Sequence, residues 1–426
     1  MSAAPTSPRA SAGRSAATSR AVARLRFAPL LALTGLAALA VRVAAALTLD
    51  HPEVKGDALT FHIVARKLAD GQGFRAPFAD VPTAEHPPGW ELVLAAADLL
   101  GATSFTSHRI VGAAIGTLTV VGIGLLGRRI AGDAVGLLAA ANAAVHPMLW
   151  GADVSLMSEP LYGLLLVAAL LLATRVRDRP TAARAAALGA AIGLATLARG
   201  EAIALLVLLA VPLLWRRRRP LAAAFAACAL TIAPWTVRNL TTFDAPVLIS
   251  VNANTVWIGA NCRETYAGPL EGHWSFGCFT PMRPGEDEAE WSVRQRSEGL
   301  EYARDHAGDL PGVAVARVAR TLELWDFRQS QFLGAQEGRA LRPLTWGIRM
   351  TWVLLALAPF GVLVLARRGR PLTELLAPVA LVLALSVAVY GMTRFRFAAE
   401  PSLCVLAAAS LAALLRWPTR SGTSRT

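Results

Sequence analysis

The residues in this sequence that are best suited to chemistry are carboxylates that stand at the ends of long apolar runs. Asp57 follows the first such run, in Lys55-Gly56-Asp57-Ala58, and Glu159 precedes another, in Ser158-Glu159-Pro160. A carboxylate in such a place can accept a proton from a hydroxyl group. Two carboxylates that converge there could also share a proton or a divalent cation, so the metal dependence stays open. Both acids have a plainer alternative role, because Asp57 and Ser158 are favoured helix caps and Glu159 complements the first turn of a helix.

Two arginines near the C-terminus are the clearest candidates for an anion site. Arg394 and Arg396 stand at the end of an apolar run, in Tyr390-Gly391-Met392-Thr393-Arg394-Phe395-Arg396. Arginine holds phosphate groups with two parallel hydrogen bonds. We therefore predict that both side chains contact a phosphate. The alternative is that Glu400, six residues after Arg394, neutralises one of them.

Other charged residues stand at similar positions along the chain. His86 opens the turn His86-Pro87-Pro88-Gly89, and Arg238 follows the run that ends in Pro234-Trp235-Thr236-Val237. We predict that both assist in binding the phosphate. Arg199 and Glu201 flank Gly200 between two apolar runs, where they could support the site or form a purely structural ion pair.

The elements that must position these residues are apolar runs of membrane-spanning length. Hydrophobic residues make up 54% of the 426-residue chain and charged residues only 17%, against roughly a quarter in soluble proteins. The net charge of +13 does not indicate nucleic-acid binding, because the arginines cluster between the apolar runs. We predict an all-α membrane protein with ten transmembrane segments, at residues 27–49, 109–127, 133–150, 159–174, 183–198, 201–215, 220–237, 345–366, 373–391 and 401–416.

The arginine clusters predict how these segments thread the bilayer. With the N-terminus inside, every cluster falls on the cytoplasmic face, as Arg-rich loops do: Arg128-Arg129, Arg175 to Arg179, Arg216 to Arg219, Arg367 to Arg370, and Arg416 with Arg420. Nearly all acids then fall outside. We predict a multi-pass protein of the plasma (bacterial inner) membrane with both termini in the cytoplasm.

Threading also divides the chain into modules. The predicted parts are a disordered cytoplasmic tail at 1–26, a membrane module at 27–237 with a first exoplasmic loop at 50–108, an exoplasmic loop subdomain at 238–344, membrane helices at 345–416 and a cytoplasmic tail at 417–426.

Two features of the predicted exoplasmic loops stand out. In the first loop, Phe61, Val64, Ala65 and Leu68 share one helical face, which predicts a helix lying along the membrane surface. In the long loop, Cys262 and Cys278 could form a disulfide in an oxidising compartment, with free thiols as the alternative.

The order of short motifs resembles the GT-C fold membrane glycosyltransferases, in particular bacterial relatives of protein mannosyltransferases and of the aminoarabinose transferase for lipid A. The similarity covers most of residues 27–416. It is carried by these motifs in order: Gly56-Asp57, Ala65-Arg66-Lys67-Leu68-Ala69-Asp70-Gly71, His86-Pro87-Pro88-Gly89, Ser158-Glu159-Pro160-Leu161, Arg199-Gly200-Glu201, Pro234-Trp235-Thr236-Val237-Arg238-Asn239, and Arg394-Phe395-Arg396-Phe397 with Glu400-Pro401.

This resemblance implies transfer of a sugar from a polyprenyl-phosphate donor to an envelope acceptor (a glycan, lipid or protein) on the exoplasmic face. It implies that Asp57 is the catalytic base, that Glu159 is the second acid, and that Arg394 and Arg396 contact the donor phosphate. Gly56-Asp57-Ala58 stands where relatives have paired acids, so the sequence gives no certain cofactor, and a divalent cation would have to use Asp57 and Glu159. The alternatives are a polytopic transporter or lipid flippase, and a non-catalytic membrane partner with the same fold.

Overall fold

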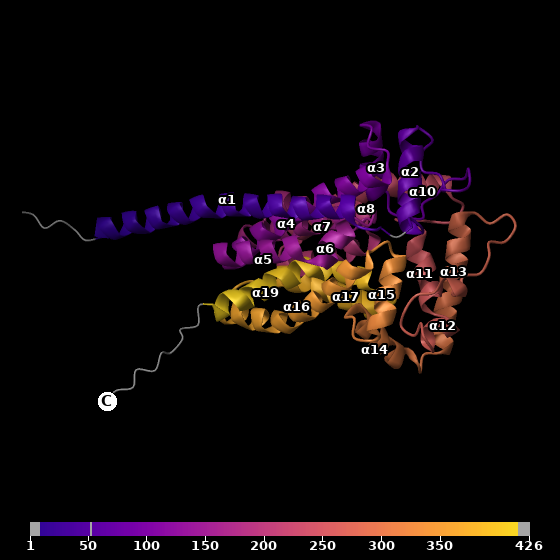
Figure 1. Ribbon diagram of the computed structural model, residues 1–426. Coiled ribbons are helices and arrows are strands. Elements are labelled where there is room, and N and C mark those ends of the chain that lie inside the picture. Colours follow the sequence, from indigo (N-terminus) through magenta and orange to yellow (C-terminus); the bar gives the residue numbers. More distant parts are fainter. Residues whose placement is uncertain (1–8, 52, 416–426) are drawn as a thin grey trace, which may run out of the picture.

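The backbone forms an all-helical bundle that carries a group of shorter helices at one end (Figure 1). The computed structural model describes residues 9–51 and 53–415, with side chains from residue 27 onward. Across these residues no β-strand forms, and the one β pairing is an isolated bridge between Arg75 and Pro82. The predicted all-α class is confirmed. Residues 1–8 of the predicted N-terminal tail, the whole predicted tail at 417–426 and the arginines at 416 and 420 lie outside the described residues.

The bundle helices correspond one for one to the predicted apolar runs. They are α1 (Arg9–Thr48), α4 (Phe105–Ala131), α5 (Asp133–Val145) with α6 (Pro147–Asp153), α7 (Glu159–Asp178), α8 (Ala182–Ala198), η1 (Gly200–Ala204) with η2 (Leu206–Ala210) and α9 (Val211–Leu214), α10 (Arg218–Thr242), α16 (Leu341–Arg367), α17 (Thr373–Ala388), and α18 (Thr393–Arg396) with η4 (Phe397–Ala399) and α19 (Glu400–Leu414). By length and composition, six helices of the described chain could cross a membrane, or seven if the bent α5–α6 pair is one span. The other predicted spans correspond to the shorter apolar stretches 182–198, 200–214 and 373–388.

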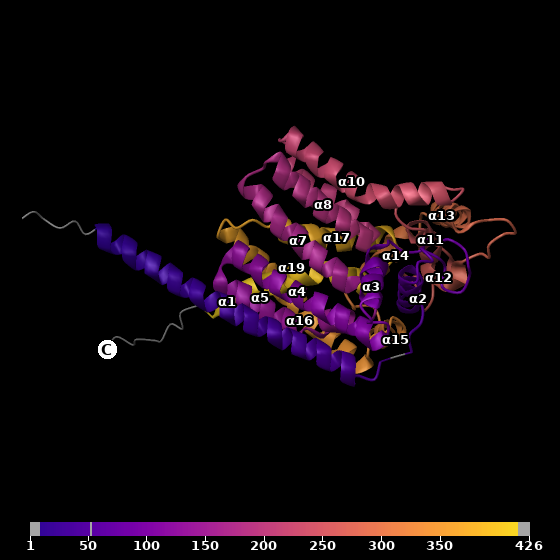
Figure 2. The same cartoon turned by 90° about the horizontal axis from the view of Figure 1, so that it is seen from above.

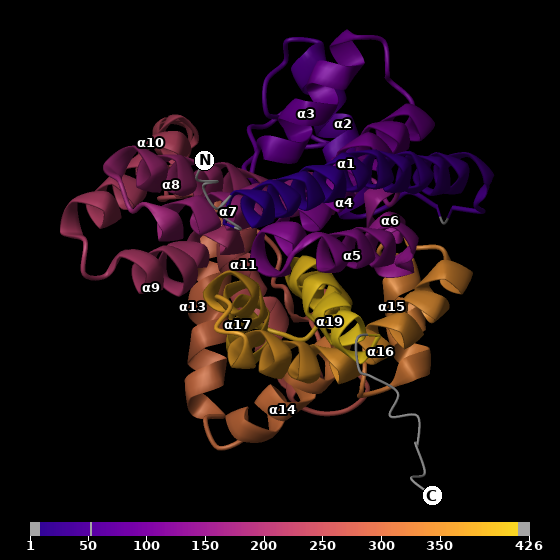
Figure 3. The same cartoon turned by 90° about the vertical axis from the view of Figure 1, so that its left-hand side faces the viewer.

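Helix α19 is the centre of the bundle. The apolar window of the α18–α19 segment is 83% buried, whereas that of α10 is only 22% buried and faces outward. A view along the bundle shows α19 between α5 and α16, the helices on which it packs (Figure 3). Gly361 of α16 lies against the carbonyl of Leu406, where an added Cβ would be 2.1 Å from that oxygen. Small residues of this kind let membrane helices approach closely. Helices α8 and α10 also pack side by side, at the edge of the bundle (Figure 2).

A buried ion pair joins α1 to α6. Arg42 Nε lies 2.7 Å from Asp153 Oδ2, and the two side chains are 1% and 4% exposed. Asp153 is buried between these helices. It is the last residue of α6, which bends by 59° from α5 and thereby turns the carboxylate inward toward α1.

Charged residues at the end of the bundle away from the short helices link neighbouring connections. Arg129 at the end of α4 pairs with Asp178 at the end of α7, and Arg177 binds Glu374 at the start of α17 through two hydrogen bonds of 2.7 and 2.8 Å. Three of the predicted loop ends are therefore neighbours. This agrees with a threading in which these arginine clusters share one face.

The opposite end carries the short helices, which we call the cap: α2 (Asp57–Ala69), α3 (Gly89–Leu99), α11 (Asn252–Ala260), α12 (Arg263–Tyr266), η3 (Phe276–Cys278), α13 (Glu288–Asp305), α14 (Leu310–Thr321) and α15 (Phe327–Gln336). Helices α2 and α3 lie across the bundle direction (Figure 1). The apolar face of α2 packs on α3 and on residues 156–157, with Phe61 only 2% exposed. This face is therefore buried inside the protein, whereas the sequence had predicted contact with the membrane surface.

The long loop is fastened internally and to the bundle. Cys262 and Cys278 form a disulfide. Arg317 of α14 donates to the carbonyls of Ala260 and Val387, at 2.8 and 3.2 Å, and so connects α11 to the end of α17. The Gly391 N–H donates to the Gly272 carbonyl at 2.8 Å. These bonds fix the segment that leads into α18.

The Arg42–Asp153 pair gives a stability prediction. Asp153→Asn should lower the stability of the folded protein by about 3–5 kcal/mol, because Arg42 would keep its charge in a buried place without a counter-ion. Thermal unfolding in detergent measures the loss. Asp80→Asn is the control, since Asp80 is 88% exposed in its pair with Arg75, and such pairs contribute at most about 1 kcal/mol. Equal losses in the two variants would contradict the prediction.

Candidate active site

One guanidinium group holds the predicted acids together. Arg394 Nε lies 2.8 Å from Glu159 Oε1, and its Nη1 lies 2.8 Å from both Asp57 Oδ2 and Glu337 Oε2. These residues come from α18, α7, α2 and the α15–α16 connection. Asp57 and Arg394 are 337 positions apart in the chain. The structure thus brings together Asp57, Glu159 and Arg394, as the sequence predicted.

The local backbone frees Asp57 for this contact. Asp57 is the first residue of α2, and the N-cap is Gly56, which has φ 56°, a left-handed conformation that glycine adopts without strain. No side-chain bond caps α2, so the alternative role of Asp57 as a cap is wrong. Ser158 makes no capping bond to α7 either. Both acids begin a helix, where the dipole favours negative charge.

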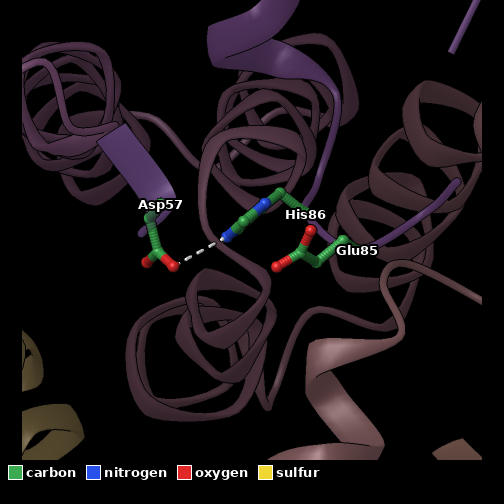
Figure 4. Close-up of side chains that lie close together, drawn as sticks. All are labelled: Asp57, Glu85 and His86. Atoms are coloured by element: carbon green, nitrogen blue, oxygen red, sulfur yellow. Dashed lines mark ion pairs between the residues drawn. The ribbon is translucent and has the colours of Figure 1, made fainter. Parts of the chain in front are cut away.

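His86 is the second cation beside Asp57. Its Nε2 lies 3.4 Å from Asp57 Oδ1 (Figure 4), and the ring packs on Phe61 with centroids 4.4 Å apart. Burial favours neutral imidazole, but Asp57 and Glu85 outweigh it and raise the pKa of His86 to about 9. In turn, burial opposes the charge of Asp57, while His86 and Arg394 hold the pKa of this carboxyl well below its usual range. Asp57 is therefore an anion at neutral pH, and 32% of its side chain stays exposed.

Arg199 and Glu201 belong to the same cluster. Arg199 Nε lies 2.6 Å from Glu201 Oε1, and Arg199 Nη1 lies 3.3 Å from Glu159 Oε1. The ion pair expected at this turn is present, and it also reaches Glu159. Glu159 is 1% exposed and accepts bonds from both arginines through one oxygen. Its position is that of an anchor for cations rather than of a group open to substrate.

Two predicted phosphate contacts lie elsewhere. Arg396 is 1% exposed and binds Glu400 at 2.8 Å and the Thr321 carbonyl at 2.9 Å. Arg396 is therefore the arginine that Glu400 neutralises, which was the alternative to phosphate binding. Arg238 donates to the carbonyls of Thr83 and Phe74, at 2.9 and 3.2 Å, and fastens the first loop. Both guanidinium groups are occupied by the protein, and this geometry gives the predicted phosphate contacts no support.

Sequence reasoning missed two residues of the site. Glu337 and Arg339 lie in the connection between α15 and α16, which has no periodic pattern to mark it. Arg339 is 5% exposed, and its Nη1 finds no hydrogen-bond partner within the described residues. Both line a small pocket that opens to solvent, together with Arg394, Arg320, His273, Ser330, Leu333, Gly334, Gly391, Met392 and Thr393. The one feature of the sequence that could have indicated Glu337 and Arg339 is their position just before the apolar helix that begins at Leu341.

Glu85 is a third residue that the sequence reasoning did not assign to the site, and it completes a possible cation site. Asp57, Glu85 and His86 offer ligand atoms that all lie within 4.8 Å of one another (Figure 4). The set of carboxylates and imidazole is chemically suited to a divalent cation. Glu159, the second ligand predicted from the sequence, is absent from this group. It is held by Arg394 and Arg199 instead.

The fold of this chain is similar to that of a solved archaeal oligosaccharyltransferase. The archaeal oligosaccharyltransferase AglB from Archaeoglobus fulgidus, solved with an inhibitory peptide and a dolichol-phosphate, superimposes with a TM-score of 0.55 at 14% identity over 92% of this chain and 50% of its own. Its apo form gives the same TM-score over 91% of this chain. ArnT from Cupriavidus metallidurans bound to undecaprenyl phosphate gives a TM-score of 0.42 at 17% identity, covering 90% of this chain and 77% of its own. The chain spans about half the length of the oligosaccharyltransferase.

The sequence itself matches a family over part of its length. Residues 85–249 match the family described as dolichyl-phosphate-mannose-protein mannosyltransferase. This segment contains His86, Glu159, Arg199 and Arg238. No curated protein sequence matches the chain. The resemblance predicted from the order of motifs is thus confirmed in the fold and in this family match.

The raised pKa of His86 predicts how stability depends on pH. The charge on His86 stabilises the fold fully below its unfolded pKa of 6.5, and the contribution is lost as the pH rises through about 9. The melting temperature in detergent should therefore fall across this window, with a loss of up to about 3 kcal/mol. His86→Asn should be less stable at pH 6.5 and should lack this fall. Asp57→Asn should flatten the same window, since it removes the partner. An unchanged pH dependence in both variants would show that the pair is not charged.

Proposed function

We propose that the protein is an integral membrane glycosyltransferase that moves a sugar from a polyprenyl-phosphate donor to a cell-envelope acceptor, with Asp57 as the base. The observation that carries the proposal is an anionic, partly exposed Asp57 held by His86 and Arg394. The mannosyltransferase family match over residues 85–249 and the likeness to AglB, which binds a dolichol-phosphate, support the same reading.

The chemistry can be written for these residues. The oxygen of an acceptor hydroxyl forms the new bond to the anomeric carbon of the sugar, and Asp57 accepts the proton of that hydroxyl. The bond from that carbon to the donor phosphate breaks, and the electron pair leaves with the phosphate. Attack opposite to the leaving group inverts the anomeric carbon. His86 and Arg394 keep Asp57 deprotonated before the transfer and orient its two oxygens.

Arg339 is the best-placed residue for the donor phosphate. It lines the solvent-open pocket beside Arg394 and also a second pocket, of about 300 Å³. The second pocket has mostly apolar walls, among them Leu49, Met148, Trp150 and Leu344, at the cap ends of α1, α6 and α16. A small, mostly apolar pocket beside a buried cation is chemically suited to the phosphate-bearing end of a lipid. Arg339 thus takes the role that the sequence gave to Arg396 and Arg238.

A divalent cation, if one takes part, would be held by Asp57, Glu85 and His86 and would add positive charge beside the base. His86 would then have to release its proton, because a metal ligand is a neutral imidazole. The raised pKa of His86 therefore works against cation binding below about pH 9. Arg394 and protonated His86 already neutralise Asp57. We propose that these two side chains perform the task that a cation would perform.

Sidedness follows from the same proposal. The cap would lie on the exoplasmic face of the plasma membrane, with the arginine-rich connections and both termini in the cytoplasm, as Arg-rich loops indicate. The loop at 50–108 would carry the base, and the loop at 238–344 would cover the donor pocket.

Replacement of the base tests the proposal directly. Asp57→Asn should reduce transfer at least about 100-fold, because an amide cannot accept the proton. Purified protein in lipid vesicles is given membrane-extracted lipid-linked sugars, and released polyprenyl phosphate is measured. Asp80→Asn, an exposed acid of the same loop, is the matched control and should retain full activity. Full activity of Asp57→Asn, or no release by the wild type, would contradict the proposal.

Arg339 gives a separate prediction about donor affinity. Arg339→Gln should raise the apparent KM for the lipid-linked donor by about 10- to 100-fold, the loss expected for a charged hydrogen bond. The effect on the rate at saturating donor should be smaller. Arg328→Gln, on the exposed side of α15, removes the same charge outside the pocket and should leave KM unchanged. A selective fall in the maximal rate alone would assign Arg339 to a different role.

A further inference from the structure

Glu337 is in an unusual position for a carboxylate. Its Oε2 accepts from Arg394 Nη1 at 2.8 Å, and this nitrogen also donates to Asp57 Oδ2 at 2.8 Å. Two carboxylates therefore share one NH₂ group. Asp57 has a second cation in His86, whereas Arg394 is the one cation within ion-pair distance of Glu337 in the described structure.

Glu337 also differs from the other acids in what it faces. It is the only carboxylate among the described residues that line the solvent-open pocket, and the cations there are Arg320, Arg339 and Arg394. Arg320 is occupied by the carbonyls of Glu271 and Pro269. A phosphate that enters to reach Arg339 and Arg394 must therefore come close to the carboxylate of Glu337.

A phosphate bound by Arg394 would lie next to Glu337. If Glu337 were ionised, the two negative charges would repel each other strongly, because the pocket wall is partly shielded from water. A proton on Glu337 removes the repulsion and turns one carboxyl oxygen into a hydrogen-bond donor to the phosphate. On this geometry, and resting on the function proposed above, we propose that binding of the donor phosphate is coupled to uptake of one proton by Glu337.

The charged groups around Glu337 fit this assignment. Asp57 on α2 and Glu159 on α7 lie near it, Arg394 faces it from α18, and Arg339 follows it in its own connection. Burial, Asp57 and Glu159 raise the pKa of Glu337, against the opposing effect of Arg394 and Arg339. An incoming phosphate adds a further negative charge and raises this pKa again.

Other titratable groups of the site are unsuited to take up this proton near neutral pH. His273 lines the pocket, but burial lowers its pKa to about 4. His86 has a pKa raised to about 9 and is already protonated. Tyr390 is a neutral phenol near neutral pH and keeps its proton with or without the ligand. Glu337 is left as the group whose proton can follow the phosphate.

The sign of the pH dependence follows. If the bound state holds one more proton than the free state, affinity falls as the pH rises, by up to tenfold per pH unit. The dependence extends from the pKa of Glu337 in the free protein to its pKa in the complex. Below and above this window, affinity is flat.

Titration calorimetry tests the coupling. The probe is a short polyprenyl methyl phosphodiester, which carries one fixed negative charge and does not itself titrate near neutral pH. It is added to the full-length protein in detergent, in Pipes and in Tris buffers of equal pH, and the difference in heat gives the number of protons taken up. The wild type should take up as much as one proton, and its Kd should weaken as the pH rises from 6 to 8, a range in which His86 keeps its proton.

Two variants make the result specific. Glu337→Gln should bind without proton uptake, with a Kd that is flat across this range and tighter than that of the wild type at pH 8. Glu301→Gln, on the exposed face of α13, should behave like the wild type. Binding by the wild type without proton uptake, or equal uptake by Glu337→Gln, overturns the coupling and leaves the proposed transferase function intact. Failure of the wild type to bind the phosphodiester overturns both.

Discussion

The site depends on one cation that serves three anions. Arg394 bridges Asp57, Glu159 and Glu337, and in a partly buried place three carboxylates on one guanidinium would repel each other without further positive charge. The cluster as a whole supplies that charge. Its acids are Asp57, Glu159, Glu201 and Glu337, and its bases are His86, Arg199, Arg339 and Arg394. His86 and Arg394 lower the pKa of Asp57, and Arg394 is shared with Glu159 and Glu337, so the acidity of Asp57 depends on how these three acids share one cation.

The bundle fixes this cluster by placing helix ends at one level. Asp57 and Glu159 each begin a helix, and Arg394 lies in the short helix that opens the central span. Arg396, two positions later, is locked by Glu400 within the same span at 2.8 Å. Positions two apart on a helix do not share a face, which is why one arginine meets the acids and the other turns into the bundle. The buried Arg396–Glu400 pair thereby holds the backbone that aims Arg394.

Hydrophobicity makes most of the fold predictable from the sequence, because each apolar run must become a helix in a membrane. Sidedness also predicted that Asp57, Glu159 and Arg394 would meet. The failures have a common cause, since they concern partners that only the tertiary structure selects. The Arg42–Asp153 pair is one example, because nothing in the first apolar run marks Arg42 as the counter-ion of a residue 111 positions later. Glu337 and Arg339 follow no periodic pattern, and only the return of the α15–α16 connection beneath Arg394 brings them to the site.

Arg394 Nη1 binds two carboxylates with different demands, Asp57 and Glu337. Asp57 is fixed as an anion by His86 and stays open enough to meet a hydroxyl group. Glu337 lines the pocket together with Arg339, whose Nη1 has no hydrogen-bond partner among the described residues. A displacement at a sugar carbon needs a base on one face and a place for negative charge on the opposite face. A single guanidinium that binds the base and also lines the pocket can stabilise the base before the transfer and the phosphate after it. Arg394, which binds three acids, is therefore also the residue best placed to respond as negative charge moves from the base to the phosphate.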